Sequence, residues 1–104
     1  MTLSLSATVL VACFALTSSG RAQSADANPY TAKCQMCHGA TGLGDTPAGK
    51  AMGAHAFNSP DVIKQSDASL LAVIKNGKAK MPAFSGKLTD AQMTVLIAYI
   101  HKLQ

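Results

Sequence analysis

The sequence predicts an all-α fold of three to four short helices joined by loops. Two segments, residues 66–76 and 89–103, repeat apolar residues at helical spacing and begin with residue types that favour helix N-caps. The rest of the chain shows no alternation of apolar and polar residues of the kind that predicts strands. With 104 residues, the chain has room for one domain.

Residues 1–22 are predicted to be a secretory signal peptide, followed by one domain over residues 23–104. Leu3 to Leu16 is an apolar stretch of 14 residues, which suits a signal peptide and is too short to span a bilayer. Gly20-Arg21-Ala22 and Ala25-Asp26-Ala27 both offer small residues for cleavage, the second as late as residue 27. No Lys or Arg precedes the apolar stretch, which departs from the usual signal pattern. We expect an exported, periplasmic protein.

Cys13 leaves a second interpretation of the N-terminus open. Leu10-Val11-Ala12-Cys13 resembles the lipobox at which bacterial lipoproteins are cleaved and acylated. Acylation there, or an uncleaved N-terminus, would tether the protein to a membrane. With cleavage after Ala22, Cys13 is removed.

The first helix is predicted to begin at Asn28-Pro29 and to run to about His38. Asn is a favoured N-cap, and Pro is favoured at the first helical position, where its missing N–H costs nothing. Tyr30 and Cys34 are four residues apart and therefore share one face of this helix.

The end of this helix carries the pattern C-x-x-C-H, on which c-type haem is covalently attached. Cys34 and Cys37 are spaced to form thioethers with the two vinyl groups at one edge of a porphyrin. His38, next in sequence, is placed to bind the iron. The motif therefore predicts one haem c with its iron.

Other uses of the two cysteines fit the sequence poorly. A zinc site needs a second pair of ligands, and after Cys37 the chain offers only His55 and His101, which are too far apart. A thioredoxin-like site would be expected beside a βαβ pattern, which is missing.

A glycine-rich loop is predicted over residues 39–49, where it would let the backbone lie close to the porphyrin. The loop lacks the strand and the Lys-Ser/Thr pair of a phosphate-binding loop. Ser66 or Asp67 can cap the next helix, and Gly77 lies just past its end. Thr89-Asp90-Ala91-Gln92 is a capping box that begins the terminal helix.

Met81, in the loop between the last two helices, is the predicted second axial ligand. Pro82 keeps it out of helical conformation, and this loop has enough chain to pass around the edge of a porphyrin. Met36, Met52 and Met93 are expected to fill the core. His55 is the rival ligand and would give a bis-histidine iron.

Taken together, these segments resemble a small class I monohaem cytochrome c over residues 28–104. The resemblance rests on C-x-x-C-H, Ile74-Lys-Asn-Gly77, Lys80-Met81-Pro82-Ala-Phe84 and Leu96-Ile97-Ala-Tyr99-Ile100. It implies the cytochrome c fold around one covalent haem, Met81 as axial ligand, and attachment of haem outside the bacterial inner membrane. It also implies that the carbonyl of Pro47 accepts a hydrogen bond from Nδ1–H of His38. Pro29 departs from the family pattern, because it shortens the first helix.

Charge favours a protein partner. From residue 28 onward the chain has eight Lys and four Asp. Lys75, Lys78, Lys80 and Lys87 flank Met81 and form a predicted lysine rim, which would steer acidic redox proteins towards the haem edge. Alternatively, these lysines are an ordinary solvated face. Export and the modest net charge of +4 argue against nucleic acid.

The resulting hypothesis is a soluble, monomeric, periplasmic electron carrier with His/Met-ligated iron. Such iron has no open position for a substrate, so we expect no enzymatic activity. One alternative is a haem enzyme or sensor with a labile sixth ligand. Another is a haem-binding subunit of a larger redox complex.

Overall fold

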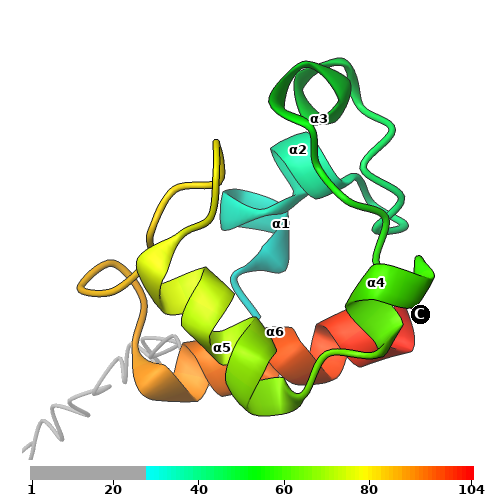
Figure 1. The fold of residues 1–104 in the computed structure, drawn as a ribbon. Coiled ribbons are helices and arrows are strands. Elements are labelled where there is room, and N and C mark those ends of the chain that lie inside the picture. Colours follow the sequence, from blue (N-terminus) through cyan, green and yellow to red (C-terminus); the bar gives the residue numbers. More distant parts are fainter. Residues whose placement is uncertain (1–27) are drawn as a thin grey trace, which may run out of the picture.

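A computed structural model of the chain describes residues 28–104, so the predicted signal peptide and Cys13 lie outside the described residues. The described part holds six short helices (Figure 1). They are α1 (Tyr30–Lys33), α2 (Gln35–His38), α3 (Pro47–Met52), α4 (Pro60–Ile63), α5 (Asp67–Asn76) and α6 (Asp90–Lys102). Beyond helices and turns, residues 28–104 contain only two isolated β-bridges. The all-α prediction is confirmed, with more helices than expected.

The first predicted helix is divided into α1 and α2. Cys34 lies between them with φ −121° and ψ −35°, which interrupts regular helical geometry. The side chain of Asn28 accepts a hydrogen bond from Tyr30 N–H at 3.0 Å, but Pro29 is the N-cap and Tyr30 the first helical residue. The helix therefore starts one residue later than predicted, and the break at Cys34 was not predicted.

Two further helices form in segments that the sequence pattern left as loops. Both begin with a proline, Pro47 in α3 and Pro60 in α4, preceded by Thr46 and Ser59 in extended conformation. The predicted loop over residues 39–49 was wrong at its end, because residues 47–49 form the first turn of α3. A fixed proline φ at the first helical position favours such short helices.

The two longer helices follow the predictions closely. Ser66 caps α5 by accepting a hydrogen bond from Ser69 N–H at 3.1 Å, and Gly77 ends the helix with φ 75°. In α6 the capping box is complete, because Thr89 and Gln92 each accept a hydrogen bond from the other's backbone N–H. No helix among the described residues is long and apolar enough to cross a membrane.

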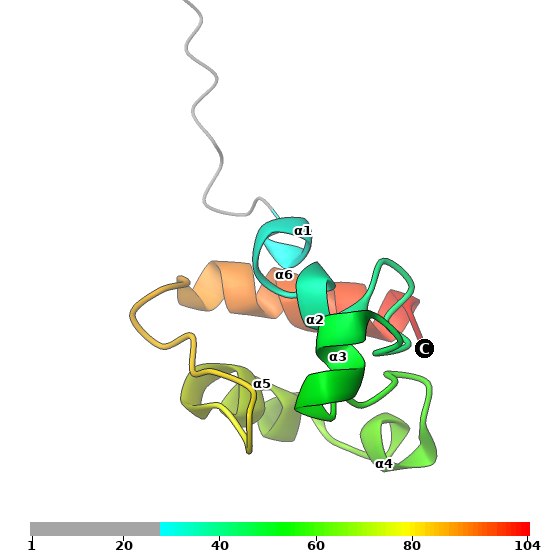
Figure 2. The ribbon, with the colours of Figure 1, turned by 90° about the horizontal axis from the view of Figure 1, so that it is seen from above.

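Packing places α1 against α6, and α2 beside α3 (Figure 2). Tyr30 anchors the first contact: it is 1% exposed and its ring lies 4.8 Å from that of Tyr99. The buried apolar cluster comprises Tyr30, Phe57, Val62, Leu70, Ile74, Phe84, Leu88, Met93, Leu96, Ile97 and Ile100. Residues from the whole described part of the chain thus share one core.

The prediction that three methionines fill the core was right for one of them. Met93 is 2% exposed in the core. Met36 and Met52 are 78% and 45% exposed, so for them the prediction was wrong. Both lie on short helices, α2 and α3, which contribute no residue to the buried apolar cluster.

His101 joins the last turn of α6 to the first turn of α5. Its Nε2 lies 2.6 Å from Oδ1 of Asp67, and its Nδ1 lies 2.9 Å from Oε1 of Gln104. The hydrogen bond with Asp67, followed by that with Gln104, raises the pKa of His101 above its ordinary value of 6.5.

This contact predicts a pH-dependent part of the stability. A histidine whose pKa is higher in the folded than in the unfolded state stabilises the fold when it is protonated. This stabilisation is fully present below the unfolded pKa of about 6.5, and it is lost as the pH rises through the folded pKa. Urea unfolding at about pH 5.5 and 8.5 should therefore show a larger loss at high pH for the native chain than for His101→Gln. Equal pH dependence in the two proteins would contradict this role.

Candidate functional site

A cavity of about 550 Å³ lies at the centre of the described helices. All six helices contribute side chains to it, together with the segments around residues 53–57 and 78–84. Apolar walls come mainly from α5 and α6 through Leu70, Val73, Ile74, Leu96 and Ile100. Volumes of about 300–1,000 Å³ are typical of sites for small molecules and cofactors.

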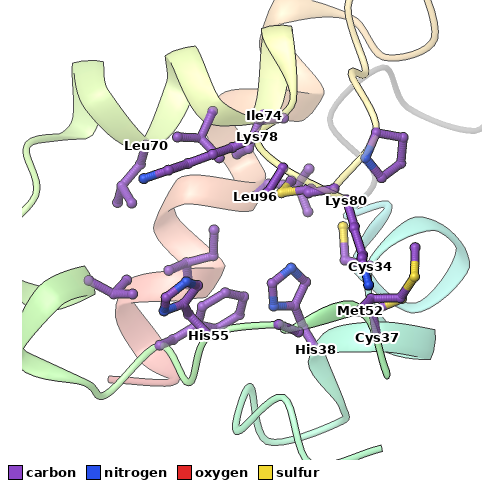
Figure 3. Close-up of a pocket in the computed structure, with 18 of the residues that line it drawn as sticks. Cys34, Cys37, His38, Met52, His55, Leu70, Ile74, Lys78, Lys80 and Leu96 are labelled. Carbon is purple, nitrogen blue, oxygen red and sulfur yellow. The ribbon is translucent and has the colours of Figure 1, made fainter. Parts of the chain in front are cut away.

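The three functional residues of the C-x-x-C-H motif all line this cavity (Figure 3). Cys34 and Cys37 are half-buried free thiols. The backbone N–H groups of Cys37 and His38 both donate to the carbonyl of Cys34, which winds the motif into the single turn of α2. Burial, with a smaller effect from Cys37, raises the pKa of the Cys34 thiol to about 11. Both thiols therefore face one space from one turn, as the spacing predicted.

The imidazole of His38 lines the cavity and packs on an aromatic ring. Its ring stacks on Phe57 with centroids 4.7 Å apart and planes inclined by 25°. Burial lowers the pKa of His38, an effect that the nearby backbone of His55 opposes and the His55 side chain reinforces. A neutral imidazole is the form that binds a metal ion.

The structure does not show the hydrogen bond predicted between His38 and Pro47. Nδ1 of His38 is buried without a hydrogen-bond partner. Pro47 is the first residue of α3, a helix that the sequence analysis did not anticipate. The hydrogen bond to the carbonyl of Pro47 stays a prediction.

Thr46, which the sequence analysis missed, holds the motif from one side. Its hydroxyl donates to the carbonyl oxygens of Met36 and Cys37, at 2.7 and 3.1 Å, and accepts from the N–H of Gly49 at 2.9 Å. On the other side, the hydroxyl of Tyr30 donates to the carbonyl of Gly39 at 2.6 Å. A threonine directly before a proline is a strong N-cap signal and could have been recognised.

Met81 lines the same cavity from the loop that follows α5. Its side chain is half-buried, and two backbone hydrogen bonds with Lys78, at 2.9 and 3.2 Å, close a tight turn. Within this turn Ala79 has φ 52°, the only positive φ of a non-glycine residue among the described residues. The thioether of Met81 and the imidazole of His38 are thus presented to one space by different parts of the chain.

His55, the rival ligand, also lines the cavity but is poorly placed for that role. Its backbone lies next to the imidazole of His38. Figure 3 shows both histidines on the same side of the cavity, away from Leu70 and Ile74. Ligation by both histidines would require donors on different sides of one iron, which this placement disfavours.

The lysines that line the cavity are only partly those of the predicted lysine rim. They are Lys33, Lys64, Lys78 and Lys80. Lys78 and Lys80 belong to both sets. Lys75 instead pairs with Asp90 at 3.3 Å, and the amine of Lys87 lies 5.9 Å from the centroid of the Phe84 ring. Lys75 and Lys87 therefore have other neighbours, and neither lines the cavity.

The residues that line the cavity fit a covalently bound haem. They supply two free thiols on one helical turn, a half-buried imidazole whose Nδ1 is buried and unpartnered, and a thioether from a separate loop. Soft sulfur and imidazole donors in apolar surroundings suit iron of a c-type haem.

Comparison with known proteins shows the family to which the chain belongs. The protein family described as cytochrome c oxidase, cbb3-type, subunit III matches residues 22–100. The chain is 36% identical over 76 residues to the cbb3-type cytochrome c oxidase subunit CcoP of Azospirillum brasilense. That alignment covers 71% of this chain and 26% of the CcoP subunit, so the chain spans about a quarter of this relative.

Shorter relatives are matched over most of their length. The chain is 33% identical to cytochrome c6 of Leptolyngbya boryana, and the alignment covers 68% of this chain and 80% of that cytochrome. It is 32% identical to cytochrome c6 of Bryopsis maxima, and that alignment covers 73% of this chain and 85% of the relative. Among solved structures, KustC0563 c-type cytochrome superposes with a TM-score of 0.66 at 28% identity, covering 72% of this chain and 92% of that one. The similarity therefore extends to the fold as well as the sequence.

Proposed function

Since the chain belongs to the family of small monohaem c-type cytochromes, we propose that it carries single electrons between redox proteins. Electron transfer is the common activity of this family, and its cofactor is covalent haem c with iron. The observation that carries the proposal is the cavity, which brings two thiols, an imidazole and a thioether to one space.

We assign a role to each of these side chains. Cys34 and Cys37 would hold the haem through thioethers, and His38 and Met81 would bind its iron. When bound, the haem supplies a one-electron Fe(II)/Fe(III) couple. Met81 closes the remaining ligand position and, with the apolar walls of α5 and α6, favours the reduced state. Because Met81 leaves no open position for a substrate, we propose a carrier rather than an enzyme.

The proposed location is the periplasm, reached through the signal peptide of residues 1–22, and the proposed state is a monomer. The CcoP match supports a second candidate, a haem-binding subunit of a larger redox complex. The two cytochrome c6 matches, which span most of those proteins, favour the free carrier. Size-exclusion chromatography of the native protein from its host separates the two: a free carrier elutes at the mass of one chain.

Docking of an acidic partner is proposed at Lys78 and Lys80. Electron transfer from the reduced protein to an acidic redox protein should slow by more than about tenfold between roughly 10 and 200 mM salt, because the Debye length falls from about 30 Å to under about 8 Å. The double charge reversal Lys78→Glu/Lys80→Glu should slow it at low salt and leave the potential nearly unchanged. Stopped-flow mixing measures both effects.

A matched control is Lys50→Glu/Lys102→Glu, which changes the net charge equally. Both residues are exposed and neither lines the cavity. If the two double variants slow transfer equally, only net charge matters. If neither salt nor charge reversal affects the rate, Lys78 and Lys80 are an ordinary solvated face.

A further inference from the structure

The end of α5 and the loop that carries Met81 meet at Gly77. This residue has φ 75° and ψ 169°, a combination essentially restricted to glycine. A Cβ atom at Gly77 would lie 2.6 Å from the carbonyl oxygen of Met81, 2.9 Å from the nitrogen of Ala83 and 3.0 Å from the carbonyl carbon of Pro82. All three are backbone atoms, which have no rotamer that avoids the clash.

Backbone hydrogen bonds hold the same loop on α5 beyond Met81. The N–H of Phe84 donates to the carbonyl of Ile74 at 2.9 Å, and the N–H of Ser85 donates to that of Lys75 at 3.1 Å. Before Met81, the turn closed by Lys78 begins directly after Gly77. The loop is therefore fixed to the last turn of α5 on both sides of Met81, and a displacement at Gly77 reaches Met81 through rigid backbone.

We propose that Gly77 is a positioning residue for Met81. Its missing side chain lets the backbone of Met81, Pro82 and Ala83 lie directly against the end of α5, and this sets how far the thioether reaches into the cavity. The inference rests on the proposed role of Met81 as an iron ligand. It goes beyond that role, because Gly77 neither binds iron nor lines the cavity.

The simpler role of Gly77 would be to end α5, since glycine often follows the last helical residue. Gly86 allows the two roles to be separated. It also has a positive φ, 78°, but a Cβ at Gly86 would meet nothing within 4 Å. Alanine therefore strains the backbone at both positions, and only at Gly77 does it also push on the backbone of Met81.

The test compares Gly77→Ala with Gly86→Ala in the haem-loaded protein. Four quantities are measured: the iron–thioether absorption band of the ferric form, the midpoint potential, the rate of carbon monoxide binding to the ferrous form, and the urea midpoint. Both variants should unfold at lower urea. Only Gly77→Ala should weaken the band, lower the potential and bind carbon monoxide about tenfold faster or more, because a larger fraction of molecules has an open iron.

Three results would contradict the proposal. The first two would reject only the positioning role of Gly77, and the third would also reject the role of Met81 as an iron ligand. If Gly77→Ala loses stability but keeps the band, the potential and the carbon monoxide rate, Gly77 only ends the helix. If Met81→Ala, measured in parallel, changes these quantities while Gly77→Ala does not, the positioning role fails and the ligand role stands. If Met81→Ala leaves them unchanged, the ligand role fails, and with it the positioning role.

A second variant covers the case in which Gly77→Ala does not accumulate. Gly77→Ala/Ala79→Gly relaxes the strained turn at Ala79, and is compared with Ala79→Gly alone. The double variant should show the same weakened band, lower potential and faster carbon monoxide binding. If it too fails to fold while Gly86→Ala folds, Gly77 is required by the fold itself, and the positioning role is wrong.

Discussion

Replacing Met81 with alanine is expected to lower the midpoint potential by on the order of 0.1 V or more, a part of the roughly 0.8 V that axial ligation spans. The thioether favours ferrous iron, so its loss favours the ferric state. The variant should also bind carbon monoxide readily when reduced, because the sixth position is then open. Potentiometric titration and flash photolysis measure the two effects.

Met52→Ala is the matched control for this prediction. Met52 also lines the cavity, but from α3 and with its side chain 45% exposed. We expect its potential and carbon monoxide rate to stay close to those of the native protein. An unchanged potential and no new ligand binding in Met81→Ala would reject Met81 and return attention to His55.

The second large effect is expected from Cys34→Ser/Cys37→Ser. Native protein matured in a competent host should keep its haem through denaturation and acid–acetone extraction, because thioethers are covalent bonds. The double variant should lose all of this retention, which a haem stain of a denaturing gel detects.

Cys13→Ser is the control, because it removes the remaining cysteine of the chain without touching the motif. Its haem should be retained as in the native protein. Free extraction of haem from the native protein, or retention in the double variant, would refute covalent attachment at Cys34 and Cys37.

The parts of the fold that could be predicted are those encoded by neighbouring residues. Ser66 and Thr89 cap α5 and α6 through hydrogen bonds to residues three positions later, so the signal lies within four residues. The C-x-x-C-H motif is equally local. Its two thiols and imidazole share one helical turn, and therefore one side of the cavity, whatever the rest of the chain does.

The parts that could not be predicted depend on distant contacts. The break at Cys34 and the short helices α3 and α4 give too little apolar periodicity to be recognised. Lys75, predicted to belong to the lysine rim, pairs with Asp90 on another helix. Each of these outcomes depends on which segments meet in space.

The hydrogen bonds of Tyr30 and Thr46 on either side of the C-x-x-C-H motif affect the rate of electron exchange. When the charge of a haem iron changes by one unit, the surrounding groups shift. The energy of that shift is called the reorganisation energy, and it adds to the activation barrier of electron transfer. Tyr30 holds the chain just after His38, Thr46 holds the turn before it, and Phe57 supports the imidazole face. Groups that hydrogen bonds and stacking already fix have less left to rearrange when that charge changes. We therefore expect this site to exchange electrons quickly during brief encounters, because part of its response to the new charge is built in before the partner arrives.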